Sequence, residues 1–353
     1  MPTNDAIIRI KPLGFPWETS DPFLFCVHHD DRYPAGNEGM GPAASLAGRD
    51  IGQDFAGKDG WRMYHGMAVP GFPAHPHRGF ETVTIVRKGL TDHSDSLGAA
   101  ARFGGGDVQW LTAGAGIVHA EMFPLLDTEA PNPLELFQIW LNLPARSKMK
   151  PAHFTMFWSE DIPHLHAPDA HGRETVVACI AGRLAHAGAA SPLPPPPDSW
   201  ASEPEADLAI WTLKMAPGAH FVLPPASGRE TRRKLYFFKG ASITVAGTAV
   251  GHHAAIEVHA GVPIELVNGA AEAELLMLQG RPIGEPVAQY GPFVMNTQAE
   301  LHQAFADYQR TQFGGWPWPD PAPVHGADPT RFARHADGCV ERREDAGGAP
   351  PHA

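Results

Sequence analysis

The stretch GFPAHPHRGFETVTIVRKG, residues 71–89, decides the fold of this chain. Its central part, ETVTIV at 81–86, is a run of β-branched residues and predicts a β-strand. Two histidines, His75 and His77, precede this run and lie two positions apart. Because alternate residues of a strand point to the same face, the two imidazoles can hold one cation together. The stretch therefore predicts strands that carry a pair of potential metal ligands.

Short strand patterns continue on both sides of this stretch. DVQWLT at 107–112 follows a glycine turn, and LELFQIWLNL at 134–143 ends at Pro144. A second strand-rich stretch runs from about residue 174 to residue 281. The chain of 353 residues also contains 37 glycines and 36 prolines, which suits many short strands joined by tight turns. These features predict an all-β protein with two barrel or sandwich domains.

The residues after 297 predict a short helix followed by a tail. Thr297 and Glu300 fit a capping box, and Gly314 is placed to end the helix. One face of this helix would collect the apolar side chains of Leu301, Phe305 and Tyr308. The last 30 or so residues are rich in proline and glycine, and we expect them to be poorly ordered.

The composition excludes several classes of protein. The net charge of −12 disfavours direct binding to nucleic acid, and no run of about 18 apolar residues predicts a membrane span. The three cysteines lie far apart without a CxxC pair, which argues against a disulfide framework and favours a reducing compartment. The first residues lack the pattern of a signal peptide. We therefore expect a cytoplasmic protein.

A second pair of potential ligands follows in AGAGIVHAEMF, residues 113–123. His119 and Glu121 again lie two positions apart on a predicted strand. Two such pairs on two strands can converge inside a barrel and supply three imidazoles and one carboxylate. A mixed set of nitrogen and oxygen ligands suits a divalent metal such as iron. The spacing thus predicts one metal site formed by both strands.

Other histidines are weaker candidates, because about one H-x-H pair is expected by chance in a chain with 20 histidines. His164 and His166 stand between two prolines without a strand pattern, so we interpret them as part of a surface loop. His220 stands alone in the second half and is interpreted as a solvated or satisfied histidine. The aromatic residues near the ligand strands, Phe80, Trp110 and Phe137, are more typical of a core than of a pocket wall.

Four blocks of the sequence, in this order, resemble the pirin family of the cupin superfamily: HPHRGFETVT, QWLTAGAGIVHAEM, LFQIWLNLP and EPVAQYGPFVMNT. The resemblance covers about residues 61–310. It implies two cupin-type, jelly-roll-like β-barrel domains facing each other, with one mononuclear iron in the first. We place these domains at 1–145 and 146–297, the second lacking a metal set, and the helix and tail at 298–353. Matched to the family pattern, the metal ligands fall on His75, His77, His119 and Glu121.

The broader cupin pattern offers a different carboxylate, Glu81, as the fourth ligand. The pirin pattern uses Glu121 instead, and the blocks around both residues match that family. Glu81 would then be a structural carboxylate or would orient a histidine N–H, rather than bind the metal. This chain also carries a long stretch at 28–45 and a tail beyond 313, either of which could cover or narrow the site.

Four ligands leave two octahedral positions open for a substrate. A substrate with adjacent hydroxyl and keto oxygens could chelate there, lose its hydroxyl proton to Glu121, and react with dioxygen. The resemblance implies quercetin 2,3-dioxygenase chemistry, so we predict an iron-dependent dioxygenase acting on a flavonol-like compound. The alternative implied by the same family is a non-enzymatic, redox-sensitive regulator that binds protein partners. The same four ligands would serve both functions.

Overall fold

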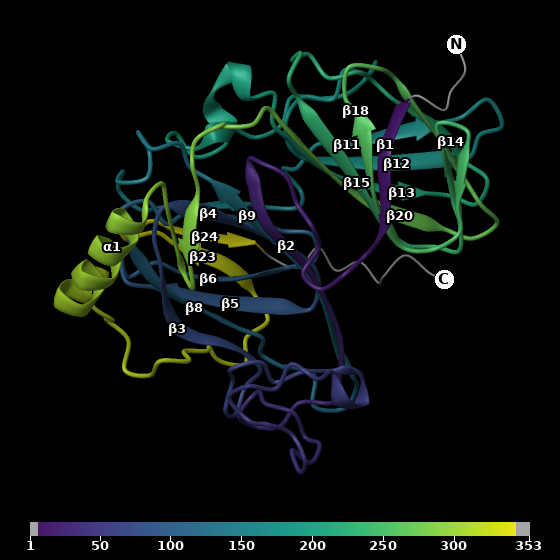
Figure 1. Cartoon of the computed structure of the whole chain (residues 1–353). Coiled ribbons are helices and arrows are strands. Elements are labelled where there is room, and N and C mark those ends of the chain that lie inside the picture. Colours follow the sequence, from purple (N-terminus) through teal and green to yellow (C-terminus); the bar gives the residue numbers. More distant parts are fainter. Residues whose placement is uncertain (1–5, 344–353) are drawn as a thin grey trace. The chain divides into compact units, whose positions relative to one another are not determined.

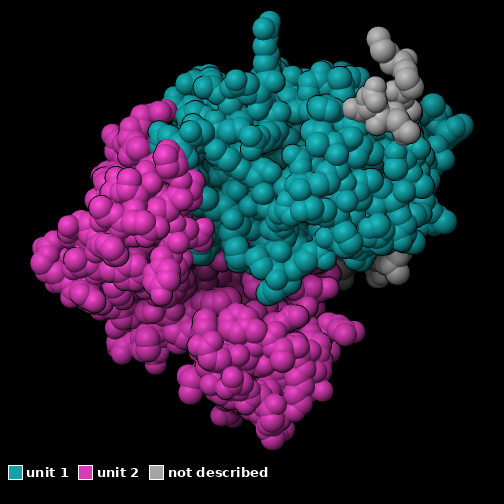
Figure 2. All heavy atoms as spheres, viewed as in Figure 1, with its two compact units in different colours: residues 1–27, 139–144, 157–285 teal, residues 28–138, 145–156, 286–353 magenta. Residues whose placement is uncertain are grey.

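The computed structural model describes residues 6–343 and consists mainly of β-strands. Among these residues there is one α-helix, α1 (Gln298–Thr311), near the C-terminus (Figure 1). This confirms the all-β class predicted from the sequence. The chain forms two compact units, which are coloured separately in Figure 2. The first unit comprises residues 1–27, 139–144 and 157–285, and the second comprises residues 28–138, 145–156 and 286–353.

The first unit contains two antiparallel sheets that enclose an apolar core. Its buried residues come from both sheets and include Val177, Leu235 and Leu266. The larger sheet has seven strands in the order β1 (Ile7–Pro12), β18 (Ala254–His259), β15 (Arg232–Lys239), β20 (Ala273–Gly280), β13 (Ala209–Met215), β12 (Glu174–Ala181) and β11 (His164–Pro168). The smaller sheet has four strands in the order β14 (His220–Leu223), β19 (Ile264–Asn268), β16 (Ile243–Val245) and β17 (Thr248–Val250).

The second unit also contains two main sheets, and the strands that carry the predicted ligands belong to one of them. One sheet has five strands in the order β10 (His153–Phe157), β7 (Val108–Thr112), β4 (Phe80–Lys88), β9 (Asn132–Asn142) and β2 (Phe23–Tyr33). The other sheet has six strands in the order β24 (Val340–Arg343), β23 (Arg331–Arg334), β6 (Ala100–Gly104), β5 (Leu90–Asp95), β8 (Ile117–Met122) and β3 (Gly71–His77).

The strands predicted at 81–86, 107–112 and 134–143 correspond to β4, β7 and β9. β4 is buried over most of its length, as expected for β-branched residues packed between sheets.

One local interpretation was wrong: His164 and His166 do not lie in a loop. They belong to the edge strand β11, which the flanking prolines obscured in the sequence.

Helix α1 begins as the sequence predicted. The Thr297 side chain accepts a hydrogen bond from the Glu300 backbone N–H, and the Glu300 side chain accepts one from the Thr297 backbone N–H. The helix packs against a small two-stranded sheet, β21 (Ala288–Tyr290) and β22 (Phe293–Met295), through a cluster of apolar side chains. Arg78 also reaches the helix and donates a hydrogen bond to Asp307 over 2.9 Å.

The tail after α1 packs onto the second unit. Phe332 of β23 lies opposite Arg102 of β6, and β23 in turn pairs with β24. Trp318 donates a hydrogen bond to the backbone oxygen of Asp95. The expectation of a poorly ordered tail is therefore wrong for residues up to 343, because strand pairing supplied by β6 outweighs the high proline and glycine content. Residues 344–353 lie outside the described part, and the domain limits at 145 and 297 stay a prediction.

The connections described by the structure include the short 3-10 helices η2 (Lys58–Gly60), η3 (Trp200–Ser202), η4 (Pro204–Ala206) and η5 (Gln312–Gly314). In the part of the chain that the structure describes, no helix has the length and hydropathy needed to cross a membrane.

Candidate metal centre

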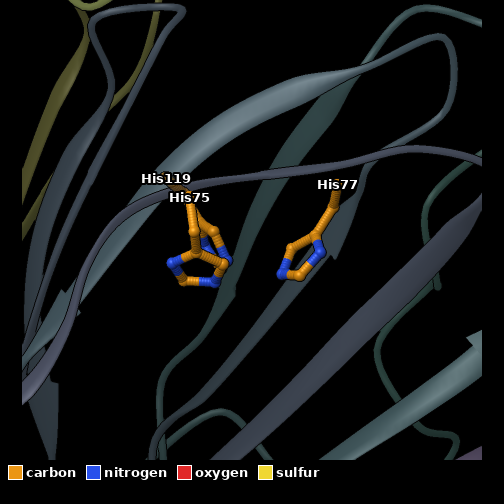
Figure 3. A group of neighbouring side chains, drawn as sticks. All are labelled: His75, His77 and His119. Carbon is orange, nitrogen blue, oxygen red and sulfur yellow. The ribbon is translucent and has the colours of Figure 1, made fainter. Parts of the chain in front are cut away.

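Strands β3 and β8 are antiparallel neighbours, and their pairing brings the two predicted ligand pairs together. His75 lies directly opposite His119 in the register. The imidazole nitrogens of His75, His77 and His119 that could bind a metal all lie within 4.8 Å of one another. Their rings gather in one place, as Figure 3 shows. The three histidines therefore come together as the sequence predicted, and their role as metal ligands stays a prediction.

The hydrogen bonds of the first two histidines indicate which ring nitrogen carries the proton. His75 donates from Nδ1 to the backbone oxygen of Pro73 over 2.9 Å, and His77 Nδ1 lies 3.4 Å from the backbone oxygen of Pro292. A carbonyl oxygen can only accept a hydrogen bond, so Nδ1 carries the proton in both rings. The Nε2 atom of each ring then presents its lone pair, the form that binds a metal.

His119 gives an independent sign that the site is built for an ion. Its side chain is fully buried, and neither ring nitrogen has a hydrogen-bond partner in the structure. Leaving a buried polar group without a partner costs about 1–3 kcal/mol. A metal ion bound between the three rings would satisfy one of these nitrogens. The residues present thus fit a mononuclear metal ion.

Burial also keeps the three imidazoles neutral. Desolvation lowers the pKa of His75 to about 4 and holds the pKa values of His77 and His119 well below the usual 6.5. The neighbouring His75 ring, whose positive charge would repel theirs, lowers the pKa values of the other two further. Neutral imidazole is the form that a metal requires, so proton competition is weak at neutral pH.

Glu121 lies beside this group but is tied to other side chains. Its Oε2 atom is 3.8 Å from His119 Nε2. The carboxylate accepts hydrogen bonds from Thr84 Oγ1 over 3.2 Å and from Gln138 Nε2 over 2.7 Å. Burial raises the pKa of Glu121, while the nearby His93 and the two hydrogen bonds act in the opposite direction. The carboxylate is close enough to complete the set, and its role as fourth ligand stays a prediction.

Glu81, the rival carboxylate, is found in a different environment. It is fully buried on β4 and accepts a hydrogen bond of 2.6 Å from Thr112 Oγ1 on β7. Glu81 and Thr112 are also direct neighbours in the pairing of these two strands. The three-histidine group includes residues of β3 and β8 but not Glu81. The hydrogen bond to Thr112 indicates a structural role within the five-stranded sheet.

A fourth buried histidine was missed by the sequence reasoning. His93 on β5 lies opposite Glu121 in the pairing with β8, and its ring centroid is 5.6 Å from that of His119. Its Nε2 atom lies 3.0 Å from Asp95 Oδ2, and its Nδ1 atom has no hydrogen-bond partner. The signal was present in TDHSD, where His93 and Asp95 share the i, i+2 spacing of the recognised pairs.

The other candidate residues do not join the group. His166 is exposed on β11 and lies 2.9 Å from Glu174, and His220 on β14 lies 2.8 Å from Glu265. Both belong to the first unit. Three aromatic residues near the ligand strands are fully buried core residues, as expected, and these are Phe80, Trp110 and Phe137.

Family models match both halves of the chain. A model described as Pirin matches residues 17–141, and a model described as Pirin C-terminal cupin domain matches residues 210–314. A solved structure with the description quercetin 2,3-dioxygenase from Acinetobacter baumannii is similar, with a TM-score of 0.66 and 27% identity. That match covers 88% of this chain and 98% of the other.

Curated relatives agree with these matches. A Pseudomonas aeruginosa protein named "Putative quercetin 2,3-dioxygenase" is 36% identical over 249 residues, which is 69% of this chain and 79% of that protein. Pirin-1 of Arabidopsis thaliana is 37% identical over 246 residues, which is 69% of this chain and 78% of that protein. Together with the three-histidine group in the strands that carry the family's blocks, these similarities show that the chain belongs to the pirin family.

Proposed function

We propose that this protein is an oxygenase that holds one iron ion and adds dioxygen to a flavonol-like chelating substrate, with the ring opening of a quercetin 2,3-dioxygenase. The observation that carries this proposal is the convergence of three neutral imidazoles, from His75, His77 and His119, within 4.8 Å of one another. With Glu121 as a fourth ligand, two positions of an octahedral ion remain for a bidentate substrate.

The donor set supports a transition metal such as iron. Imidazoles and one carboxylate suit iron, whereas magnesium and calcium prefer oxygen ligands alone. When bound, the ion would supply Lewis acidity, which lowers the pKa of a chelated hydroxyl, and a path for electrons to dioxygen. The histidines would hold the ion rigidly, because His75 and His77 are fixed by hydrogen bonds to backbone oxygens.

Glu121 would also accept the proton of the substrate hydroxyl. Burial raises the pKa of this carboxylate, so it holds a proton more readily than an exposed glutamate does. Its hydrogen bonds from Thr84 and Gln138 fix the orientation of both oxygens without removing all their accepting capacity. The group would therefore combine ligation through one oxygen with proton acceptance at the other.

The names of the relatives supply the reaction class. The proteins from Pseudomonas aeruginosa and Acinetobacter baumannii both carry quercetin 2,3-dioxygenase in their names. Flavonols of this kind carry the adjacent hydroxyl and keto oxygens that a metal with two open positions can chelate. Dioxygen and a small aromatic molecule are therefore the proposed partners of the site.

The experiment is oxygen uptake by iron-reconstituted protein with quercetin as the probe. We expect one dioxygen consumed for each flavonol lost from the visible spectrum, and no uptake by a His119→Ala variant. Full iron content without oxygen uptake on any flavonol would overturn the oxygenase proposal. In that event, binding of protein partners that changes with the oxidation state of the iron would favour the regulatory alternative.

A further inference from the structure

The three histidines differ in exposure, and the difference indicates which of them lies nearest to solvent. His119 is fully buried and His77 is 4% exposed, whereas His75 is only partly buried. His75 is therefore the member of the group nearest to solvent. Side chains next to His75 are in a position to contact the part of a substrate that extends away from the ligand atoms.

An aromatic ring lies beside His75, and two more pack against that ring. The ring centroid of Phe72 is 6.4 Å from that of His75, and Phe72 pairs with Glu121 across β3 and β8. His65 packs edge-on against Phe72 at 5.7 Å, and Phe55 packs edge-on against His65 at 5.1 Å. Phe55 is 40% exposed, and the other two are partly buried. We call Phe55, His65 and Phe72 the aromatic wall.

Two members of the wall come from the connection between β2 and β3, residues 34–70, which includes the long stretch noted in the sequence. This connection is held by a buried network rather than left loose. Arg49 donates to Asp54 Oδ2 over 2.8 Å, and the same oxygen accepts from the Met63 backbone N–H over 3.0 Å. Asp54 and Tyr64 also form a backbone bridge, and each directly precedes a member of the wall. The positions of Phe55 and His65 are thus fixed before any substrate binds.

A second network anchors the same connection to β2. The Tyr64 hydroxyl donates to Asp31 Oδ2 over 2.6 Å and lies 2.6 Å from His29 Nδ1, and all three side chains are buried. The Tyr64 ring packs against Phe72 at 5.0 Å. A preorganised wall loses little conformational freedom on binding, which favours a specific contact over a chance one.

His65 offers a polar group within the wall. Its Nδ1 atom is 2.7 Å from the backbone oxygen of Gly52, which can only accept, so Nδ1 carries the proton. In the neutral ring Nε2 is then an acceptor. This nitrogen could accept a hydrogen bond from a hydroxyl group on an aromatic ring.

From this arrangement we propose that the aromatic wall binds the ring system of the chelating substrate, so that Phe55 and His65 determine specificity for aromatic over aliphatic chelators. The aromatic nature of the substrate rests on the proposed function. The ring of the substrate would pack against the exposed part of Phe55 and against Phe72, while its oxygens reach the ligand side of His75.

The test is the binding of 4-nitrocatechol, a coloured aromatic chelator, to iron-loaded protein without oxygen. We expect Phe55→Ala to weaken this binding about tenfold, which corresponds to about 1.4 kcal/mol. His65→Ala should weaken it about threefold or more, since one hydrogen bond and one ring contact are lost. Binding of acetohydroxamate, a chelator with two oxygens and no ring, should stay within about twofold in both variants.

Met67→Ala is the matched control, because Met67 belongs to the same connection and is 66% exposed. It should leave both affinities and the iron content unchanged. If Phe55→Ala and His65→Ala keep full iron content and bind 4-nitrocatechol with unaltered affinity, the proposal that the aromatic wall binds the substrate ring is wrong. The two proposals can fail separately. If 4-nitrocatechol binding depends on Phe55 but no oxygen is taken up with flavonols, the aromatic wall is supported and the oxygenase proposal is wrong.

Discussion

The two units differ in the side chains that they bury, although the interior of each lies between two sheets. In the first unit the interior is a cluster of apolar side chains, with Val177, Leu213 and Phe237 among its members. In the second unit the buried faces of β3, β5 and β8 carry His77, His119 and other ionisable groups. The one histidine that the first unit places on β14, His220, is partly exposed and lies next to Glu265.

This contrast distinguishes the apolar side chains that stabilise a pair of sheets from the polar side chains that can bind a ligand. Each apolar side chain in the first unit stabilises the fold by about 1.5–3 kcal/mol when it is fully buried. The buried imidazoles of the second unit lack that gain, and His119 leaves both ring nitrogens without partners. An interior of this kind is explained by a ligand that the polar groups hold, because the fold alone does not require it.

The largest expected effect is the loss of metal on changing His119. His119→Ala removes the fully buried histidine whose ring nitrogens have no hydrogen-bond partner among the described residues, so we expect bound iron to fall to near zero. His220→Ala in the first unit should leave the iron content unchanged. Elemental analysis of both purified variants is the measurement. Equal iron content in the two variants would show that His119 does not bind the iron. The metal would then lie at another site, such as His164 and His166.

The two candidate carboxylate ligands, Glu121 and Glu81, can be distinguished by their effect on iron affinity. Glu121→Gln should lower iron affinity by roughly tenfold to hundredfold, since the amide is a weaker ligand than the carboxylate. Glu81→Gln should change iron affinity by less than about threefold, because Glu81 hydrogen bonds to Thr112 in the other sheet. Competition with a coloured chelator measures both affinities. The reverse ranking would make Glu81 the ligand.

Core truncation in the first unit should affect stability and leave the metal in place. Leu235 is fully buried in the apolar cluster, so Leu235→Ala should reduce the free energy of unfolding by about 2–5 kcal/mol. Urea unfolding gives the stability, and elemental analysis of the folded variant gives the iron content. A variant that keeps its stability would show that the first unit does not depend on this core.

The smallest expected effect for a single step, here one pH unit, concerns acid stability and the buried His29 in the second unit. Burial first, and the positive charges of Arg62 and His28 next, lower the pKa of His29 to about 3. The unfolded chain takes up this proton near pH 6.5, so the folded state loses stability as pH falls from 6.5 towards 3. The loss approaches about 1.4 kcal/mol per pH unit for one proton.

The His29→Asn variant isolates this contribution. The asparagine amide can still donate a hydrogen bond near the position of Nδ1, but it has no proton to take up in this range. Urea unfolding of metal-free protein at several pH values should therefore show a smaller dependence on pH in the variant. The three site histidines also titrate, so the difference between the two proteins is the quantity of interest. Identical slopes would mean that His29 is already protonated in the folded state.

Much of the site could be predicted from residues that are close in the sequence. The i, i+2 spacing of His75 with His77 and of His119 with Glu121 predicts a common face, because strand geometry sets that face within two residues. The capping box at Thr297 is likewise local and was confirmed. The missed His93 followed the same spacing, but nothing in a single strand shows that it lies opposite Glu121.

By itself the sequence determined the all-β class, the start of the helix and the common face of each i, i+2 pair of candidate ligands, since each depends on the local periodicity of side chains. Only the tertiary structure decided that β3 lies beside β8, that Phe55 and His65 reach the side of Phe72, and that β23 pairs with β6. These contacts join residues far apart in the chain. Their register is set by long-range strand pairing and the packing of side chains between sheets, which local periodicity does not contain.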